Sequence, residues 1–345
     1  MPGKSKGERL QRSRSHKQSL LAEGVHGWEL MEQMMTLSLE RRESSPRSRH
    51  RCQCCWFDAD SCICQQINEL LSRENHILSL TSSVSSLLLD EQHPAVNVKL
   101  LILMHPKEYM CAGNSAKLLR MLLPEKHQQQ QYQHHITVQY YIFGKLGDVD
   151  KLAREMTIDV SNTMILWPDK NALTVSQFLN QRPHRSQRHS TGLFSEEDGN
   201  SCLKRNLYNL TTPLIRAVLL DGTYTQARNM HKSLRKHLYP TPLPVMVQLH
   251  PMNGSVFHRA QKNYGHAHQH QQLLKLQKQS TTPADEGEEN QGVVIAYRVS
   301  TAEACGQLLL ELGVSSQILD IIVEGVIINN EALRRRFTIP RTQDG

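Results

Sequence analysis

The sequence predicts an α/β fold in which a mostly parallel sheet is covered by helices on both faces. Short, near-continuous apolar runs alternate with segments of helical periodicity, a pattern typical of parallel strands buried on both sides. The runs stop abruptly at turn residues such as Pro168-Asp169 and Asp221-Gly222. A cluster of cysteines ahead of the first run indicates a small N-terminal zinc knuckle beside the sheet.

Length and charge narrow the class of protein. The 345 residues suffice for one large domain or two modest ones. A formal net charge of +7 favours an anionic partner, with nucleic acid as the default. No apolar run is long enough to cross a membrane, and the N-terminus lacks the apolar stretch of a signal peptide. We therefore expect a cytoplasmic protein whose eight cysteines are thiols or metal ligands; the sequence indicates no protein partner and leaves the oligomeric state open.

The first 50 residues are predicted to form a basic, partly disordered arm. Residues 1–51 carry eleven Lys or Arg against six Glu, and the ends of this segment are rich in Ser and Arg. One amphipathic helix is predicted between these ends from Trp28, Met31, Met34, Met35 and Leu39. A basic arm strengthens binding to nucleic acid, although a solubilising tail fits the composition equally well.

Five of the eight cysteines lie within thirteen residues: Cys52, Cys54, Cys55, Cys62 and Cys64. Cys52 and Cys55 form a CxxC pair, Cys62 and Cys64 form a CxC pair, and Cys54 is left over. Four thiolates at this spacing are able to bind one zinc ion tetrahedrally, which favours a structural Zn²⁺. A redox dithiol and an iron–sulfur site are the alternatives. We interpret residues 51–93 as this knuckle followed by a helical linker.

Residues 94–340 are predicted to form the α/β domain. Apolar runs predict five strands, at Val96–Met104, Ile136–Phe143, Thr163–Trp167, Ile215–Leu220 and Val245–Leu249. Helical periodicity predicts helices at Asn114–Leu123, after Thr223, and at Leu308–Leu319 and Ile321–Leu333. Three polar, low-complexity segments, at about 128–135, 182–206 and 258–291, are unable to build a core, so we expect them to be surface insertions.

The stretch from Leu219 to Arg228 is the most informative part of the domain. Asp221 ends an apolar strand, and the carboxyl ends of strands are where open α/β sheets bind ligands. Thr223 and Gln226 fit a capping box, so a helix is predicted to begin there. The simpler interpretation of Asp221 is an acid favoured by the dipole at a helix N-terminus.

The helix after Asp221 is predicted to have two faces. An apolar stripe for the core is formed by Ala227, Met230, Leu234 and Leu238. Arg228, Lys232 and Arg235 form a basic stripe that suits a polyanion, although a solvated surface face has the same pattern.

Four motifs at predicted strand ends then occur in a fixed order: His105-Pro106-Lys107-Glu108, Trp167-Pro168-Asp169, Asp221-Gly222-Thr223-Tyr224 and Tyr297-Arg298-Val299-Ser300-Thr301-Ala302-Glu303-Ala304. Together with the cysteine cluster, this order resembles the DTW-domain family over about residues 51–335. One position departs from the family pattern, because Tyr224 stands where the family has its signature tryptophan. An aromatic ring is retained there.

The resemblance implies a tRNA-uridine aminocarboxypropyltransferase related to the knotted SPOUT methyltransferases, and hence a SPOUT-like knotted fold. Such an enzyme transfers the 3-amino-3-carboxypropyl group from S-adenosyl-L-methionine to N3 of a tRNA uridine, forming acp3U and releasing methylthioadenosine. A SPOUT-type RNA methyltransferase is one alternative, because it uses the same co-substrate but transfers a different carbon. A non-catalytic, zinc-containing RNA-binding protein is the other.

The resemblance also implies roles for particular residues. Asp221 is the candidate general base, and Thr223 and Tyr224 would shape the pocket around it. By analogy with the knotted enzymes, the co-substrate would lie near Leu166, Pro168, Asp169, Leu219, Ser300, Thr301 and Glu303. The cations expected to bind the RNA backbone or the co-substrate carboxylate are Arg228, Lys232, Arg235 and Arg298. Ser300 and Glu303 also fit a capping box, which gives them a structural alternative.

Overall fold

The computed structural model describes residues 6–45, 50–73, 97–123, 135–182, 214–250 and 300–338. Within these residues six strands form one parallel sheet in the order β2-β1-β5-β3-β6-β4. The strands are β1 (Asn97–Met104), β2 (His135–Ile142), β3 (Thr163–Leu166), β4 (Leu173–Thr174), β5 (Leu214–Asp221) and β6 (Val245–Gln248). The predicted α/β class and all five predicted strands are confirmed, and the two-residue β4 is the one strand here that the sequence did not predict.

The helices flank this sheet. They are α1 (Lys6–Ala22), α2 (Gly27–Glu43), α5 (Ala116–Leu122), α7 (Asp148–Thr157), α8 (Val175–Gln181), α10 (Tyr224–Leu238), α13 (Thr301–Glu311) and α14 (Ser316–Thr338), with a further helix at 64–73 and 3-10 turns at Ala59–Ser61 and Val160–Asn162. The predicted boundary between the last two helices, near residue 320, is wrong. Gly313 ends α13 instead, because its φ of +85° is a left-handed conformation that glycine adopts without strain.

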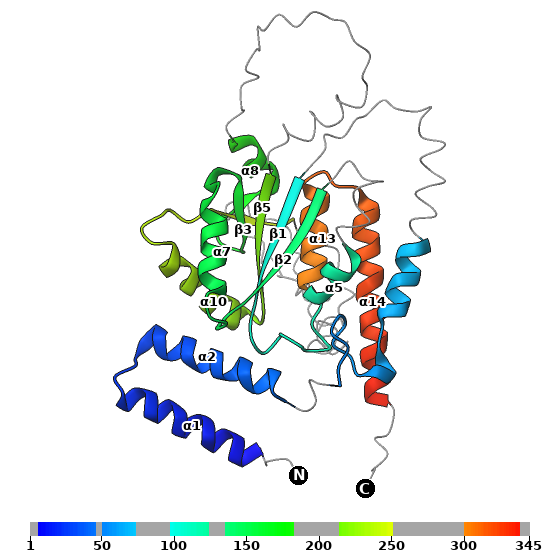
Figure 1. Ribbon diagram of the computed structural model, residues 1–345. Helices are drawn as coiled ribbons and strands as arrows, with labels where there is room; N and C mark the ends of the chain where they lie inside the picture. The colour runs from blue at the N-terminus through cyan, green and yellow to red at the C-terminus, as the bar shows by residue number, and fades with distance from the viewer. Residues whose placement is uncertain are drawn as a thin grey trace, which may run out of the picture.

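The sheet separates two hydrophobic cores. Alternate side chains of β1 enter them: Leu100 and Ile102 the first core, Leu101 and Leu103 the second. Helices α5, α13 and α14 cover the first core, and α7 and α10 cover the second (Figure 1). Covering both faces explains why β1, β3 and β5 are mostly apolar, as the sequence predicted.

The cysteine-rich knuckle is part of the first core. Cys55, Phe57 and Ile63 are fully buried and belong to the same cluster as the strand residues. The segment is therefore packed into the domain, although its residues alone are too few for a core. Residues 74–93 of the predicted linker lie outside the described residues.

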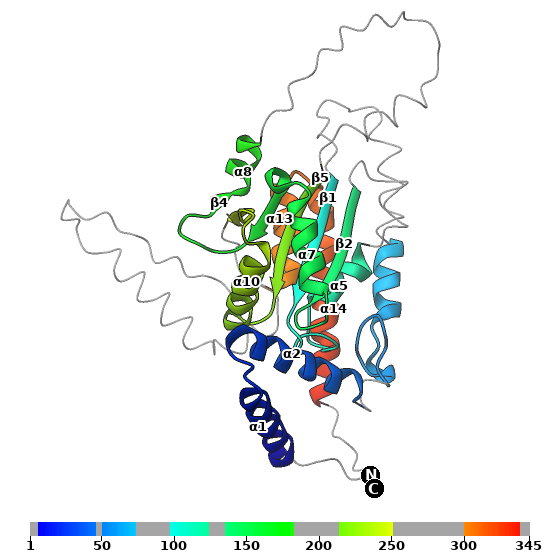
Figure 2. The ribbon, with the colours of Figure 1, turned by 60° about the vertical axis from the view of Figure 1, so that its left-hand side comes forward.

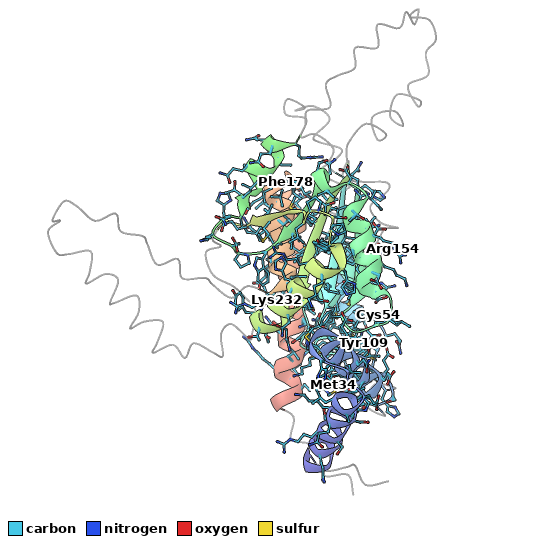
Figure 3. All side chains as sticks on the ribbon, turned by 90° about the vertical axis from the view of Figure 1, so that its left-hand side faces the viewer. Met34, Cys54, Tyr109, Arg154, Phe178 and Lys232 are labelled. Atoms are coloured by element: carbon cyan, nitrogen blue, oxygen red, sulfur yellow. The ribbon has the colours of Figure 1, made fainter. Side chains whose placement is uncertain are left out.

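Helix α2 lies at the carboxyl ends of β1 and β2. The hydroxyl of Thr36 donates to the backbone oxygen of Gly144 at 2.6 Å, and Arg42 donates to that of Tyr109 at 2.6 Å. A Cβ on Gly144 would lie 2.5 Å from Cβ of Met35, so this close approach requires glycine. In two views α2 lies below the sheet, and α8 lies at the opposite end (Figures 1 and 2; Met34 and Phe178 in Figure 3). The predicted amphipathic helix corresponds to α2, whereas α1 was not predicted from the sequence.

Two of the predicted surface insertions, at about 128–135 and 182–206, each have one end residue that belongs to the folded domain. His135 is the first residue of β2, and Arg182 is half-buried, with its Nε donating to Asn162 at 2.6 Å. The remainder of all three segments lies outside the described residues, as do residues 251–299 as a whole, so the predicted knot stays a prediction. No helix in the described part of the chain is long and apolar enough to span a bilayer.

Candidate functional site

Asp221 is the last residue of β5. The segments that follow β5 and its neighbour β1 lead to opposite faces of the sheet. The segment after β1 leads to α5 over the first core, whereas the segment after β5 leads to α10 over the second. In open α/β sheets this change of direction between neighbouring strands marks the ligand-binding crevice. The position of Asp221 is thus the one that fold geometry favours for a site.

Both carboxylate oxygens of Asp221 accept hydrogen bonds from other elements. The hydroxyl of Thr301, at the start of α13, donates to Oδ1 at 2.6 Å. The side-chain amide of Asn114, in the loop before α5, donates to Oδ2 at 2.5 Å. With Asp221 only 4% exposed, the three side chains form a buried junction of β5, α5 and α13.

The turn after Asp221 has the predicted geometry. Thr223 and Gln226 form a reciprocal capping box, in which the Thr223 N–H donates to Gln226 Oε1 at 2.7 Å and the Gln226 N–H donates to Thr223 Oγ1 at 3.4 Å. A Cβ on Gly222 would lie 3.0 Å from Gln226 Oε1 and 3.3 Å from Cβ of His105, so the turn leaves little room for a side chain. The capping box fixes where α10 begins and therefore where Tyr224 projects.

His105, the residue after β1, supports this turn. Its N–H donates to the backbone oxygen of Asp221 at 2.9 Å, and its Nδ1 accepts from the N–H of Lys107 at 3.1 Å. Burial, assisted by the cations Lys107 and Arg42, lowers the pKa of His105 to about 4. The imidazole is therefore neutral at pH 7 and has a hydrogen-bonding role in its loop.

The aromatic ring of Tyr224 is exposed on one face and stacks on Trp167 with the other. It is 57% exposed and stacks on Trp167, with ring centres 5.7 Å apart and 13° between planes. Trp167 in turn stacks on His231 at 5.1 Å. The Arg228 guanidinium lies 5.1 Å from the Tyr224 ring centre, and its Nη2 donates to the Tyr224 hydroxyl at 3.3 Å. A flat ring beside a cation suits a nucleobase and its phosphate.

The residues predicted to surround the co-substrate have different environments. Leu219 is a core residue of β5, Leu166 is half-buried at the end of β3, and Pro168 is exposed. Asp169 accepts from the N–H of Asn171 at 3.0 Å, which is a local turn contact. Among this predicted set, Thr301 is the residue that reaches Asp221 directly.

Ser300 and Glu303 cap α13 together. The Ser300 N–H donates to Glu303 Oε2 at 2.8 Å, and the Glu303 N–H donates to Ser300 Oγ at 3.1 Å. The structural alternative for this pair is therefore present, and it holds Thr301 at the first position of the helix.

The predicted RNA-binding cations lie on α10. Arg228, Lys232 and Arg235 are all exposed, and Lys232 is labelled at the side of the molecule in Figure 3. The fourth, Arg298, lies outside the described residues. The opposite stripe of α10 is buried in the second core as predicted, so the cations face away from the sheet.

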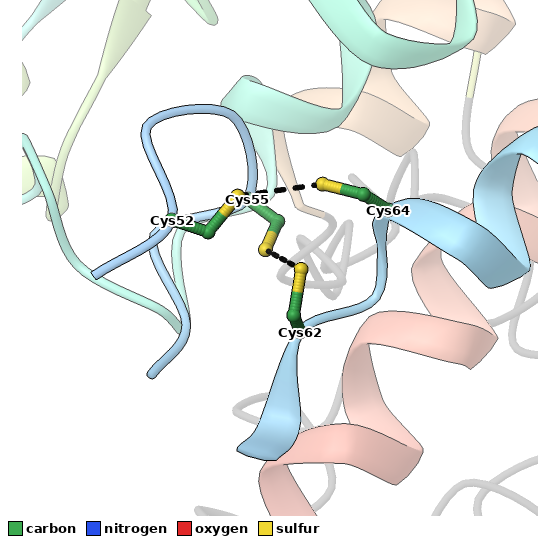
Figure 4. Close-up of side chains that lie close together, drawn as sticks. All are labelled: Cys52, Cys55, Cys62 and Cys64. Atoms are coloured by element: carbon green, nitrogen blue, oxygen red, sulfur yellow. Dashed lines mark hydrogen bonds between the residues drawn. The ribbon is translucent and has the colours of Figure 1, made fainter. Parts of the chain in front are cut away.

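The four predicted metal ligands come together (Figure 4). The sulfur atoms of Cys52 and Cys64 lie 3.5 Å apart, those of Cys55 and Cys62 lie 3.6 Å apart, and all four lie within 4.8 Å of one another. Zn–S bonds of about 2.3 Å in a tetrahedron place sulfurs roughly 3.8 Å apart. The cluster thus fits a single metal ion, and the donor set suits zinc; Cys54 is exposed and is not among the four.

Among Cys52, Cys55 and Cys64, the local environment favours deprotonation of Cys52 first. Although burial acts the other way, hydrogen bonds from the backbone of Cys55 and Cys54 and from neighbouring thiols lower the pKa of Cys52 to about 6. Burial raises the pKa of Cys55 and Cys64. Burial also lowers the pKa of Lys117 to about 7, against the opposing negative charge of nearby cysteines. A metal ion would stabilise all four thiolates together.

Comparison with protein-family models identifies the family of this chain. The family model of the DTW domain matches residues 49–333. The chain belongs to the DTW domain family. The DTW family modifies tRNA, so the resemblance seen in the sequence is confirmed. Searches of curated proteins and of solved structures returned no match.

The DTW match includes the cysteine cluster and the Asp221 junction but not α1 and α2. Sequence reasoning missed Asn114 and Lys117, which hold one side of the junction. The local signal was weak: an asparagine ahead of a predicted helix is an ordinary turn residue. Their importance appears only when β1 and β5 are placed side by side.

Proposed function

We propose that this protein transfers the 3-amino-3-carboxypropyl group from S-adenosylmethionine to N3 of a uridine in tRNA. The observation that carries the proposal is the buried junction of Asp221, Asn114 and Thr301 at the ligand-binding edge of a DTW domain. A cytoplasmic location, where thiols stay reduced, is consistent with this proposal and forms part of it.

The proposed reaction removes one proton from the uridine and replaces a carbon–sulfur bond of the co-substrate with a carbon–nitrogen bond. The N3–H bond of the uridine breaks, and N3 forms a bond to the γ-carbon of the methionine moiety. The bond between that carbon and sulfur breaks, and methylthioadenosine leaves with the electron pair, so the sulfonium charge disappears. Because the neutral imide is a poor nucleophile, the reaction needs a base for the N3 proton and an alignment that exposes the γ-carbon rather than the methyl group.

Asp221 is the proposed base. Each carboxylate oxygen can accept more than one hydrogen bond, so the bonds from Thr301 and Asn114 do not by themselves prevent Asp221 from accepting the N3 proton. The two donors also fix the direction of the carboxylate. Because Asp221 is buried, the uridine must be extruded from its stack to reach it, as enzymes that modify bases require.

The co-substrate is proposed to bind beside this junction. Its sites would be the end of β3 at Leu166, Pro168 and Asp169, the end of β5 at Leu219, and the first turn of α13 at Ser300 to Glu303. Thr223 would hold the turn that shapes the pocket. The tRNA backbone would contact the basic stripe of α10, with Arg298 as a further proposed contact.

Replacing Arg228, Lys232 and Arg235 together by glutamine is expected to weaken tRNA binding and to reduce its salt dependence. Each lost phosphate contact should lower the slope of log affinity against log salt by about 0.7–0.9. Filter binding at several KCl concentrations measures this slope. Lys151→Gln, on the exposed surface of α7, is the control. An unchanged slope in the triple variant would contradict the assignment.

Tyr224→Ala is expected to weaken tRNA binding, because stacking of a base on an aromatic ring contributes about 1–3 kcal/mol. Tyr224→Phe keeps the ring and loses the hydroxyl that contacts Arg228, so it should bind nearly as well as the wild type. Tyr224→Trp restores the family residue and should bind at least as well. Equal affinity for the alanine and phenylalanine variants would show that the ring does not stack on the RNA.

The proposed function is tested directly in cells. Nucleosides from tRNA of cells with and without the gene are compared by mass spectrometry. The expected difference is an acp3U nucleoside that is present only with the gene. Identical nucleoside profiles, or loss of a methylated nucleoside instead, would refute the proposal.

A further inference from the structure

One buried lysine lies between the cysteine cluster and the Asp221 junction. Lys117 is in the first turn of α5 and is 2% exposed. Its Nζ donates to the backbone oxygen of Ala112 at 2.5 Å and lies 4.3 Å from the centre of the Phe57 ring. Phe57 belongs to the knuckle, and its backbone oxygen accepts from the N–H of Cys52 at 2.8 Å. The ammonium group is therefore packed against the loop that carries the first cysteine pair.

This ammonium group lacks a carboxylate to balance it. Among the residues that the structure describes, no aspartate or glutamate forms an ion pair with Lys117. Burial disfavours the charged form of this side chain, so its ammonium form needs a negative charge nearby. Four thiolates around one divalent ion carry a formal charge of about −2, which is the balancing charge that this position needs.

The backbone of Lys117 also holds the partner of Asp221. Its N–H donates to Oδ1 of Asn114 at 3.1 Å, while Nδ2 of Asn114 donates to Oδ2 of Asp221 at 2.5 Å. Because Oδ1 is taken by Lys117, the amide is oriented with its nitrogen toward the carboxylate. A displacement of Lys117 would therefore displace the donor that fixes Asp221.

We propose that Lys117 is the counter-cation of the metal–thiolate centre and that the first turn of α5 couples this centre to the Asp221 carboxylate. Metal binding supplies the negative charge that the buried ammonium balances, and the anchored turn then holds the Asn114 amide in place. The coupling is reciprocal, so a change at Asn114 alters metal affinity in turn. The proposal does not depend on which group the protein transfers to RNA.

Zinc affinity of the 345-residue protein, measured by competition with a chromophoric chelator, tests both the counter-cation role of Lys117 and the coupling through α5. Lys117→Met and Lys117→Gln remove the charge with little change in volume, and glutamine keeps a donor for Ala112. Because groups outside the ligand shell typically change metal affinity by 10–100-fold, both variants should bind zinc about tenfold more weakly or worse. Lys107→Met, an exposed lysine of the preceding loop, should bind zinc as the wild type does.

The second part is tested in the same assay. Asn114→Ala removes the side chain that links α5 to Asp221 and should weaken zinc binding, by a smaller factor than the Lys117 variants. Thr301→Val breaks the other hydrogen bond of Asp221 and should change zinc affinity less than Asn114→Ala does, because Thr301 lies on α13 and not beside Lys117. Wild-type zinc affinity in both Lys117 variants would overturn the counter-cation. Equal zinc affinities for the Asn114 and Thr301 variants would overturn the coupling.

Discussion

Asp221→Asn is expected to abolish the transfer reaction while the protein stays folded. The substitution keeps the shape of the side chain but removes the negative charge that we propose accepts the uridine N3 proton. Loss of a positioned base typically lowers a rate by about 10²–10⁴-fold. The measurement is single-turnover formation of acp3U in tRNA, followed by mass spectrometry. Turnover near that of the wild type would show that Asp221 is not the base.

A double variant separates the base from the hydrogen-bond junction. In Asp221→Asn only one end of the new amide can accept, so either Asn114 Nδ2 or the Thr301 hydroxyl loses its acceptor, and an unsatisfied buried donor costs about 1–3 kcal/mol. Adding Asn114→Asp restores a donor facing an acceptor. We expect the double variant to recover thermal stability over the single variant and to remain inactive. Recovered activity would contradict the assignment of the base to position 221.

Cys55→Ser is expected to release the metal and to destabilise the whole domain. Structural zinc contributes on the order of 10 kcal/mol to the folding of small zinc modules. Cys55 and its neighbours Phe57 and Ile63 belong to the same core as the central strands, so unfolding of the knuckle would expose that core. Metal content by inductively coupled plasma mass spectrometry should fall from about one zinc per chain to none, and the melting temperature should fall with it.

Cys54→Ser is the matched control for this experiment. Cys54 lies beside Cys55 in the chain but is exposed and outside the sulfur cluster. This variant should keep both its zinc and its melting temperature. A Cys55→Ser protein that retains zinc and melts like the wild type would remove the metal centre from the account.

The parts of the site that the sequence predicted correctly depend on local patterns. The cysteine spacing indicated four ligands within one loop, and the Thr223–Gln226 box indicated the start of α10. The strands were recognisable because burial on both faces of a parallel sheet demands continuous apolar runs. In each case the interaction partners are close in the chain or repeat along it.

The parts that escaped prediction depend on contacts between distant segments. Asn114 meets Asp221 only because β1 and β5 are neighbours in the sheet, and a charged Lys117 in a core contradicts the usual preference of lysine for the surface. Continuous leucine periodicity concealed the end of α13 at Gly313. Helix α1 is rich in charged and polar residues, so it gave no apolar stripe from which to predict it.

The most direct test is to identify both products of one reaction. Purified protein is incubated with S-adenosylmethionine and unmodified tRNA, and the small molecules and the digested tRNA are analysed by mass spectrometry. The account predicts methylthioadenosine and acp3U in equal amounts. S-adenosylhomocysteine with a methylated nucleoside, or no conversion of tRNA that is fully bound, would contradict it.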